Sequence, residues 1–159
     1  TMESLSTLLR DLHDLDLTGE IDNESPFLKA HGGYCDVFWG NSRRHGGMQV
    51  AIKRLRVHVL ESREAAKLIR RELKVWSSLE HPNILPLLGY EIHDQYPALV
   101  SQWMVNGNVL VYFKEHSETS IQKMAAGIAS GLSFLHEKGV VHSDLKSDNI
   151  FVSEEGEPL

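Results

Sequence analysis

The sequence has a single cysteine, Cys35, among 159 residues, and its nine histidines show no Cys/His spacing typical of a zinc site. One cysteine excludes an internal disulfide and is typical of a protein kept in a reducing compartment. No apolar run approaches the roughly 20 residues needed to cross a bilayer, and the first residues lack the apolar core of a signal peptide. We therefore expect a cytoplasmic, intracellular protein without a membrane span.

Positive charge is also in deficit. Lys and Arg number 16 against 22 Asp and Glu, which gives a formal net charge of −6 at pH 7. This balance argues against nonspecific binding to nucleic acid, because such binding depends on basic side chains that displace counterions from phosphates. Hydrophobic residues make up 42 % of the chain, enough to build a core for one domain or for part of a larger one.

Apolar spacing predicts an α+β protein. Helical periodicity is found in three segments: 4–15, 62–80 and 117–138. Ser62 is a candidate N-cap for the second helix, and Gly139 follows the third where a C-cap is expected. Strand patterns cover five segments: 27–29, 36–40, 49–57, 84–88 and 98–101. Glycines between the first three predict an antiparallel meander, and Asn106-Gly107-Asn108 is a candidate hinge before the helical second half.

Two charged residues occupy positions where apolar ones would be expected. Glu72 follows Leu68 by four residues and precedes Trp76 by four, so it falls on or beside the apolar face of its helix. Lys53 shares a strand face with the small Ala51. An inward charge needs a partner, which predicts a Lys53–Glu72 ion pair. The alternative is that both residues lie at the edge of the core.

The segment 140–152, VVHSDLKSDNIFV, is longer and more charged than a turn requires. Its β-branched and aromatic ends are expected to form two short strands. Between them lie a carboxylate, an ammonium and an amide group that could converge on one phosphate: Asp144, Lys146 and Asn149. The alternative is a polar turn rich in Asp and Asn.

Together these motifs make the chain similar to the N-terminal part of a protein kinase domain, closest to the tyrosine-kinase-like group of serine/threonine kinases. They follow the family's order: Gly32-Gly33-Tyr34-Cys35-Asp36-Val37, Val50-Ala51-Ile52-Lys53, Glu72, His81-Pro82-Asn83-Ile84, Gln102-Trp103-Met104 and His142 to Asn149. The resemblance implies a kinase-like fold with a complete N-terminal lobe, an antiparallel sheet plus one helix. It also implies an N-terminal extension over 1–25 and a partial kinase domain over 26–159. The small lobe and hinge would cover 26–104, and the start of the helical lobe 105–159.

The resemblance also implies the reaction and its residues. The chain would transfer the γ-phosphate of ATP, with Mg²⁺, to a Ser or Thr hydroxyl of a protein substrate. Asp144 would accept the hydroxyl proton, Lys146 would neutralise charge on the phosphoryl group, and Asn149 would bind Mg²⁺. The remaining residues would form the nucleotide site: Gly32, Val37, Ala51, Lys53, Glu72, Ser101, Gln102 and Met104. Within it, Lys53 would hold the α- and β-phosphates, and Ser101 would guard the back of the adenine pocket.

The sequence departs from the family pattern in three places. Ala30 and Cys35 stand at two of the three glycine positions of the nucleotide-binding loop, and Ser143 replaces the usual arginine of the catalytic loop. The D-F-G motif and activation loop would lie beyond Leu159, so we expect a fragment that is inactive alone. A pseudokinase or scaffold that keeps the fold to bind partners is the main alternative, and a small-molecule phosphotransferase of related fold is another.

Overall fold

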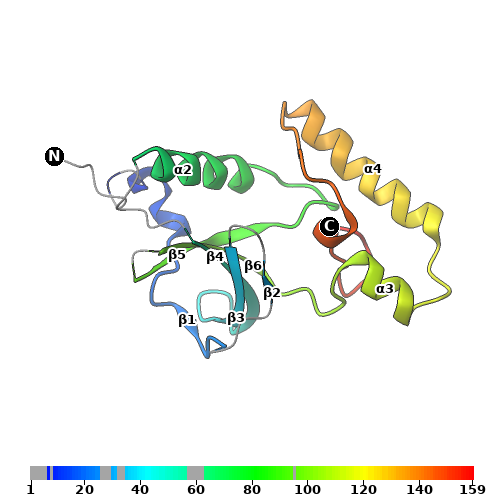
Figure 1. The fold of residues 1–159 in the computed structure, drawn as a ribbon, viewed down its shortest axis with the longest axis horizontal. Helices are drawn as coiled ribbons and strands as arrows, with labels where there is room; N and C mark the ends of the chain where they lie inside the picture. Colours follow the sequence, from blue (N-terminus) through cyan, green and yellow to red (C-terminus); the bar gives the residue numbers. More distant parts are fainter. Residues whose placement is uncertain (1–6, 8, 26–29, 32–34, 57–62, 95) are drawn as a thin grey trace. The chain divides into compact units, whose positions relative to one another are not determined.

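The computed structural model describes residues 7, 9–25, 30–31, 35–56, 63–94 and 96–159, which divide into two compact units. The first unit contains Thr1–Ser78 and Pro86–Trp103, and the second contains Leu79–Leu85 and Met104–Leu159. A sheet and a helix build the first unit, and two further α-helices lie in the second (Figure 1). The expected α+β class is confirmed.

The first unit is organised around one sheet. In its described residues six antiparallel strands have the order β1-β3-β4-β6-β5, and β2 pairs with β3 outside this path. The strands are β1 (Ile21–Asp22), β2 (Ala30–His31), β3 (Cys35–Ser42), β4 (Met48–Leu55), β5 (Leu87–His93) and β6 (Tyr96–Gln102). The expected pairing of the second and third strand segments is confirmed as β3 and β4, whereas the first segment, 27–29, lies outside the described residues.

Alternation along β6 divides the core between the two faces of this sheet. Leu99 lies on the face covered by α2 (Arg63–Ser77), in a cluster that includes Leu73. Its neighbours Ala98 and Val100 are fully buried in a second cluster. Because successive side chains of a strand point to opposite faces, the second cluster lies on the face away from α2.

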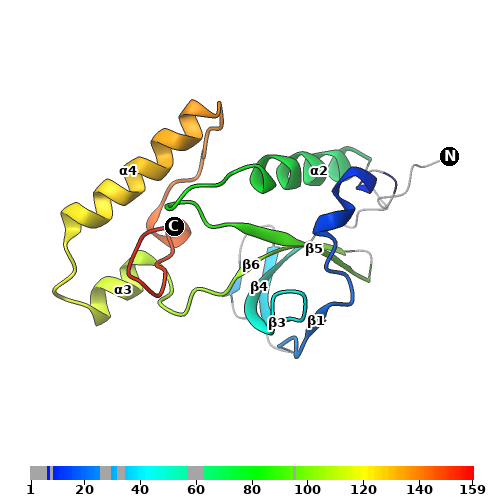
Figure 2. The same cartoon turned by 180° about the vertical axis from the view of Figure 1, so that it is seen from behind.

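Residues 9–25, here called the N-terminal strap, contribute to both faces. Leu9 is buried in the cluster with α2, whereas Leu17 is fully buried in the cluster on the other face. Between them, Asp16 forms a parallel bridge with Tyr90 of β5, and the Leu17 N–H donates to the Tyr90 carbonyl over 2.7 Å. The strap therefore passes around the β5 edge of the sheet, beginning beside α2 (Figures 1 and 2).

The start of the strap differs from the expected amphipathic helix. It forms the short 3₁₀ helix η1 (Arg10–Leu15), with non-helical backbone at Leu12 (φ −118°, ψ 18°). Leu12 and Leu15 pack against the same cluster as Leu9, so contacts with α2 and β5 decide the conformation more than helical periodicity does. Residues 1–6 and Leu8 lie outside the described residues.

Helix α2 buries a narrower stripe than its spacing predicts. Ala66, Ile69 and Leu73 are buried, but Leu68 is 64 % exposed. The expected N-cap, Ser62, lies outside the described residues. The helix ends at Ser77, and the segment Leu79–Leu85 that follows belongs to the second unit rather than to the first.

The second unit is built on α3 (Val109–Glu115) and α4 (Ile121–Glu137). Val109, Met124 and Val152 form its buried core. The side chain of Asn108 accepts a hydrogen bond from the Val111 N–H and caps α3. Sequence spacing predicted α4 but missed α3, whose start at Asn106-Gly107-Asn108 was expected to be a hinge.

The C-terminal glycine and the apolar face of α4 were predicted from the sequence, whereas its N-cap was not. Gly139 has φ +71° just after the helix and fulfils the predicted C-terminal role. The predicted apolar face is partly buried, through Met124 and Leu135, but Ile121 at its start is 69 % exposed. Ser120 supplies an N-cap by accepting a hydrogen bond from the Lys123 N–H over 3.2 Å.

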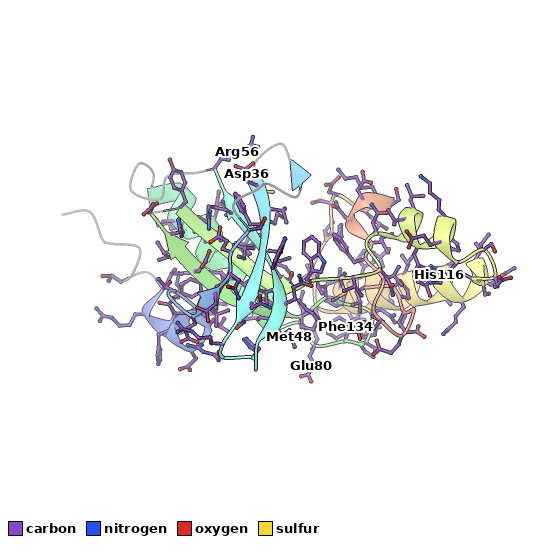
Figure 3. All side chains as sticks on the ribbon, turned by 90° about the horizontal axis from the view of Figure 1, so that it is seen from below. Asp36, Met48, Arg56, Glu80, His116 and Phe134 are labelled. Carbon is purple, nitrogen blue, oxygen red and sulfur yellow. The ribbon has the colours of Figure 1, made fainter. Side chains whose placement is uncertain are left out.

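Helix α4 also packs closely on the segment Leu79–Leu85. A Cβ atom at Gly131 would lie 2.5 Å from the Asn83 carbonyl oxygen, so only glycine allows this approach. The His81 ring stacks on Phe134, whose position Figure 3 labels, with centroids 4.8 Å apart. The Asn83 side chain donates to the Pro158 carbonyl over 2.9 Å. These contacts hold Leu79–Leu85 in the second unit.

The predicted strands on either side of the loop at 142–149 are not found. Val140 and Val141 lie outside strands, and the Val140 N–H instead donates to the Leu135 carbonyl at the end of α4. Phe151 and Val152 form only isolated bridges, with Asn108 and Pro158 respectively. The loop is therefore held by the α4 terminus and by the start of α3, not by a hairpin.

Candidate active site

The loop that carries the predicted catalytic residues is folded tightly within the second unit. Ser143 has φ +61°, an uncommon left-handed conformation for a residue other than glycine. The Asp144 N–H donates to the His142 carbonyl over 2.8 Å. A short 3₁₀ helix η2 (Ser147–Asn149) then turns Asn149 back toward Asp144. No local sequence pattern predicts the positive φ at Ser143.

The three polar side chains expected to converge do so. Lys146 Nζ lies 3.3 Å from Asp144 Oδ2. Asn149 Nδ2 donates to the same oxygen over 3.0 Å and to the Asp144 carbonyl over 2.9 Å. The Asp144 and Lys146 side chains remain 67 % and 53 % exposed. The cluster therefore presents a carboxylate, held by an ammonium and an amide group, to solvent.

The charge state of this cluster follows from its hydrogen bonds. The hydrogen bond from Lys146, followed by that from Asn149, lowers the pKa of the Asp144 carboxyl below its ordinary value. Asp144 is consequently ionised at neutral pH and can accept a proton or a hydrogen bond. Asp148 is exposed, and within the described residues no hydrogen bond ties it to Asp144 or Lys146.

The amide orientation of Asn149 bears on the expected Mg²⁺ site. Its nitrogen is committed to Asp144, and among the described residues its oxygen has no hydrogen-bond partner. Amide and carboxylate oxygens are the protein ligands that Mg²⁺ takes. Asn149 and the adjacent Asp144 carboxylate thus offer a donor set that fits the ion.

In the first unit, the residues predicted to contact nucleotide gather on one face of the sheet. Val37 of β3 is the cross-strand partner of Lys53 on β4. Ala51 of β4 is the partner of Ser101 on β6. Cross-strand partners point to the same face, so these four side chains share the face on which α2 lies. Ser101 is buried, 8 % exposed, whereas Lys53 is exposed.

The expected inward orientation of Glu72 is wrong for this structure. Glu72 is exposed on α2, and within the described residues no ion pair joins it to Lys53. The reason is its helical position: with about 100° per residue, it lies beside the stripe formed by Ile69 and Leu73 rather than within it. Sequence spacing correctly placed Glu72 beside the apolar face of α2. It could not predict whether the side chain points toward the sheet or toward solvent.

Two further predicted nucleotide contacts lie where β6 ends and where the longer segment of the second unit begins. Gln102 ends β6 as the cross-strand partner of Val50. Met104 begins the second segment of the other unit, and its carbonyl accepts a hydrogen bond from the Gly107 N–H over 3.0 Å. Gly32 lies outside the described residues, and no side chain is described for Ala30. Cys35, at the third glycine position, is buried.

The structure adds one ion pair that sequence reasoning missed, on the face of the sheet opposite the predicted nucleotide contacts. Arg56, just past β4, lies 2.6 Å from Asp36 of β3, and Figure 3 shows the two side chains together. Asp36 is the cross-strand partner of Arg54, two residues before Arg56, so the ion pair runs diagonally across the end of the β3–β4 ladder. Only the strand register, which the sequence did not supply, would have revealed this pair.

Three side chains elsewhere in the first unit could in principle hold a metal ion. Ligand atoms of Glu24, Glu91 and His93 lie within 4.8 Å of one another. However, the Arg54 guanidinium already lies 2.8 Å from Glu24 and 3.1 Å from Glu91. One guanidinium of the chain itself therefore pairs with both carboxylates, and the group is a partly buried ion-pair network.

Among the described residues no helix has the length and apolar character needed to cross a bilayer.

Comparisons with known proteins identify the family. The profile of the protein kinase domain matches residues 31–159. A probable serine/threonine-protein kinase of Dictyostelium discoideum is 33 % identical over 118 residues, covering 71 % of this chain and 22 % of that protein. The probable serine/threonine-protein kinase PBL28 of Arabidopsis thaliana is 30 % identical over 135 residues, covering 79 % of this chain and 36 % of that protein.

Tyrosine kinases are also among the relatives. Tyrosine protein-kinase src-1 of Caenorhabditis elegans is 29 % identical over 149 residues, covering 89 % of this chain and 27 % of that protein. The chain thus corresponds to about a fifth to a third of the length of these three relatives. With a domain match over most of its length and the clustered Asp144, Lys146 and Asn149, the chain belongs to the protein kinase family.

Proposed function

We propose that this chain is part of an ATP-dependent protein serine/threonine kinase. The observation that carries the proposal is the cluster in which Lys146 and Asn149 both bind the Asp144 carboxylate. Phosphoryl transfer needs positioned charges more than covalent chemistry, and this cluster has the three kinds of group required. The proposed catalytic domain occupies residues 26–159 of the chain and acts inside the cell.

Each residue of the cluster has a role in the proposed reaction. Asp144 orients the substrate hydroxyl and accepts its proton, and its lowered pKa keeps it ionised for that task. Lys146 neutralises charge as the phosphoryl group moves. Asn149 would hold Mg²⁺ through its amide oxygen. When bound, the ion offsets negative charge on the phosphates of ATP.

The proposed nucleotide site lies on the α2-facing side of the sheet. Val37 and Ala51 offer apolar surface to the adenine ring, and Lys53 binds the phosphates. The small, buried Ser101 stands beside Ala51 and leaves space behind the base. Gly32 and the backbone of Gln102 and Met104 complete the proposed set.

Specificity for Ser and Thr rests on one residue. Lys146 follows Asp144-Leu145 directly, a pattern that resembles serine/threonine rather than tyrosine kinases. Both specificities occur among the relatives, so identification of the phosphorylated amino acid tests this part of the proposal.

A pseudokinase that binds partners is the second candidate, and two observations favour it. Glu72 is exposed and makes no ion pair with Lys53 in the described residues. Cys35 and Ala30 occupy glycine positions in the nucleotide-binding loop, where side chains restrict close approach of phosphate to the backbone. The intact cluster at Asp144 argues for the kinase.

One experiment separates these candidates. The purified full-length protein is incubated with γ-labelled ATP, Mg²⁺ and a mixed protein substrate, and the acid-stable phosphoamino acids are identified. We expect phosphoserine and phosphothreonine, with incorporation abolished by EDTA. Phosphotyrosine alone would refute the specificity, and no incorporation by a protein that still folds would favour the pseudokinase.

A further inference from the structure

Backbone hydrogen bonds tie the start of α3 to the segment that directly follows Asn149. Asn108, the N-cap of α3, forms an antiparallel bridge with Phe151, and both ribbon views show the end of the chain beside the start of α3 (Figures 1 and 2). On one side of the bridge, the Val109 N–H donates to the Ile150 carbonyl over 2.8 Å. Because Ile150 is the next residue after Asn149, this hydrogen bond holds the chain immediately beside the proposed Mg²⁺ ligand.

On the other side of the bridge, a side chain completes the pairing. The Val152 N–H donates to the Gly107 carbonyl over 3.0 Å. A regular antiparallel pair would return a hydrogen bond from the Gly107 N–H, but this N–H donates to the Met104 carbonyl over 3.0 Å instead. The Asn106 side chain supplies a further tie, because its amide nitrogen donates to the Ser153 carbonyl over 2.6 Å.

The Asn106–Ser153 hydrogen bond is part-buried and lies next to the core of the second unit. Val109 and Val152 are 6 % and 0 % exposed and belong to that core. A hydrogen bond that is partly shielded from water is electrostatically stronger than one in solvent. The Ser153 carbonyl also accepts from the Gly156 N–H over 3.0 Å, so Asn106 binds a carbonyl group that is already fixed in a turn.

The Asp144 loop depends on this pairing because strands do not flank it. Val140 and Val141 lie outside strands, and η2 is a single turn of three residues. The Asn149 amide nitrogen is bonded to Asp144, and among the described residues its oxygen has no hydrogen-bond partner. Where that oxygen points therefore depends on where residues 150–153 are held.

Asn106 also has a simpler role in its own turn. It is the third residue of the turn that the hydrogen bond from the Gly107 N–H to the Met104 carbonyl closes, and asparagine is a favoured turn residue. Aspartate has a similar preference for turns, whereas only the amide can donate a hydrogen bond to a carbonyl. This difference allows the two roles of Asn106 to be separated by experiment.

We propose that Asn106 is a positioning residue for the Asp144 cluster: by holding the Ser153 carbonyl, it fixes residues 150–153 and with them the placement of the Asn149 side chain against Asp144. Among the described residues, Asn106 forms no hydrogen bond with the cluster itself, so it acts through the backbone. The consequence for Mg²⁺ binding rests on the proposed function, but the placement of Asn149 does not.

Asn106→Asp tests the proposal, because it removes the donor and keeps the size and turn preference of the residue. Asn108→Asp is the matched control, since it makes the same chemical change and adds the same charge two residues away. The Asn108 side chain accepts a hydrogen bond from the Val111 N–H over 3.0 Å, and aspartate caps a helix about as well as asparagine does. Asn106→Gly is a second test variant that removes the donor without adding charge.

NMR of the ¹⁵N-labelled 159-residue chain gives two measurements that need no activity. Solvent exchange of the Val152 amide proton reports on the pairing with the start of α3. Exchange of the Asn149 side-chain amide protons, identified by their loss in Asn149→Ser, reports on the hydrogen bonds to Asp144. Loss of one hydrogen bond changes a local opening equilibrium by roughly two- to tenfold. We expect both Asn106 variants to accelerate both exchange rates by about that factor, and Asn108→Asp to leave both unchanged.

Two results would overturn the proposal. Faster exchange at Val152 with unchanged exchange at the Asn149 side chain would show that the Asn106–Ser153 hydrogen bond is only structural. Equal acceleration in Asn108→Asp would show that added charge or a general loosening of the turn, rather than loss of the donor, is the cause.

The full-length protein tests the link to the metal. At a fixed concentration of the ATP–Mg²⁺ complex, the free Mg²⁺ concentration that gives half the maximal kinase rate should rise in both Asn106 variants by about the factor seen at Asn149, and should not change in Asn108→Asp. A merely structural role would lower the melting temperature without moving this concentration. Faster Asn149 exchange with an unchanged Mg²⁺ requirement would count against Asn149 as the metal ligand, which belongs to the proposed function, and would leave the positioning by Asn106 supported.

Discussion

Replacing Gly131 of α4 by alanine has two opposing effects. Alanine has the higher helix propensity, but its Cβ atom would come too close to the Asn83 backbone. In an open helix position the change stabilises by about 1 kcal/mol, because alanine is the better helix former. Here the new Cβ would lie 2.5 Å from the Asn83 carbonyl oxygen, about 0.9 Å short of the ordinary 3.4 Å contact. The obstructing atom is backbone, so the helix and the segment Leu79–Leu85 must separate.

The cost of that separation exceeds the gain from propensity. Overpacking of this kind costs about 1–3 kcal/mol, and displacement of Asn83 threatens its 2.9 Å hydrogen bond to the Pro158 carbonyl, worth about 1 kcal/mol. After subtraction of the propensity gain, we expect Gly131→Ala to destabilise α4 by about 1–3 kcal/mol. That corresponds to a loss of roughly five- to 150-fold in hydrogen-exchange protection over 121–137, if exchange there follows local opening.

Ala129→Gly supplies the matched control for propensity. Ala129 is exposed two residues earlier on the same helix, so the reverse change there should cost about 1 kcal/mol from propensity alone. Peptide-resolved exchange of wild type and both variants gives the comparison. A Gly131→Ala helix as protected as the wild type, or more so, would show that Asn83 does not press on α4 and would refute the reasoning.

Three further predictions follow from buried positions in the first unit. Burial raises the pKa of the Glu91 carboxyl, although the hydrogen bond from Arg54 opposes this shift. The protonated carboxyl therefore contributes its full stabilisation below the pKa of the unfolded chain, about 4.3. This contribution is lost as the pH rises through the pKa of the folded protein. Glu91→Gln, measured by urea unfolding, should therefore gain stability relative to wild type as pH rises from acid to neutral; a constant difference would contradict this. Gly89→Ala would place a Cβ 2.2 Å from the Leu15 carbonyl oxygen, so it should increase hydrogen exchange in the strap, and unchanged exchange would show that the strap does not pass there. Ser101→Phe in the full-length protein should weaken adenine-site inhibitors that carry a bulky group, whereas equal affinity would show that residue 101 does not line the pocket.

The sequence was most informative where one chain segment carries all the partners. Asp144, Lys146 and Asn149 lie within six consecutive positions, so their convergence needs only a tight loop. The strands β3 and β4 and the helices α2 and α4 could also be predicted from the sequence, since each has its own apolar periodicity. The C-cap at Gly139 followed from the same local pattern.

Features that depend on contacts between distant segments could not be predicted from the sequence. Whether Glu72 turns inward depends on how α2 packs on the strap and on β5 and β6, and these segments are distant from it in sequence. The leucines of the strap suggested a regular helix, but packing on two faces of a sheet gives a short 3₁₀ turn and an extended segment instead. Helix α3 was missed because its run VLVYFKE lacks a polar face of clear period.

The division of the chain was also beyond sequence reasoning. Nothing in Leu79–Leu85 marks it as part of the second unit, because the contacts that hold it there come from Gly131, Phe134 and Pro158. Such tertiary contacts leave only weak traces in a single sequence. A small residue on a helix face and an aromatic residue near its end were the available signals.

The central claim is that Asp144, and not the nearby Asp148, is the carboxylate that acts in phosphoryl transfer. Asp144 is held by Lys146 and Asn149, whereas Asp148 is exposed outside the cluster. The decisive measurement is kcat of the full-length protein with each residue changed to asparagine, alongside ATP affinity. We predict that Asp144→Asn lowers kcat at least about 100-fold with nucleotide affinity unchanged, and that Asp148→Asn stays near the wild-type rate. An inactive Asp148→Asn together with an active Asp144→Asn would contradict the account.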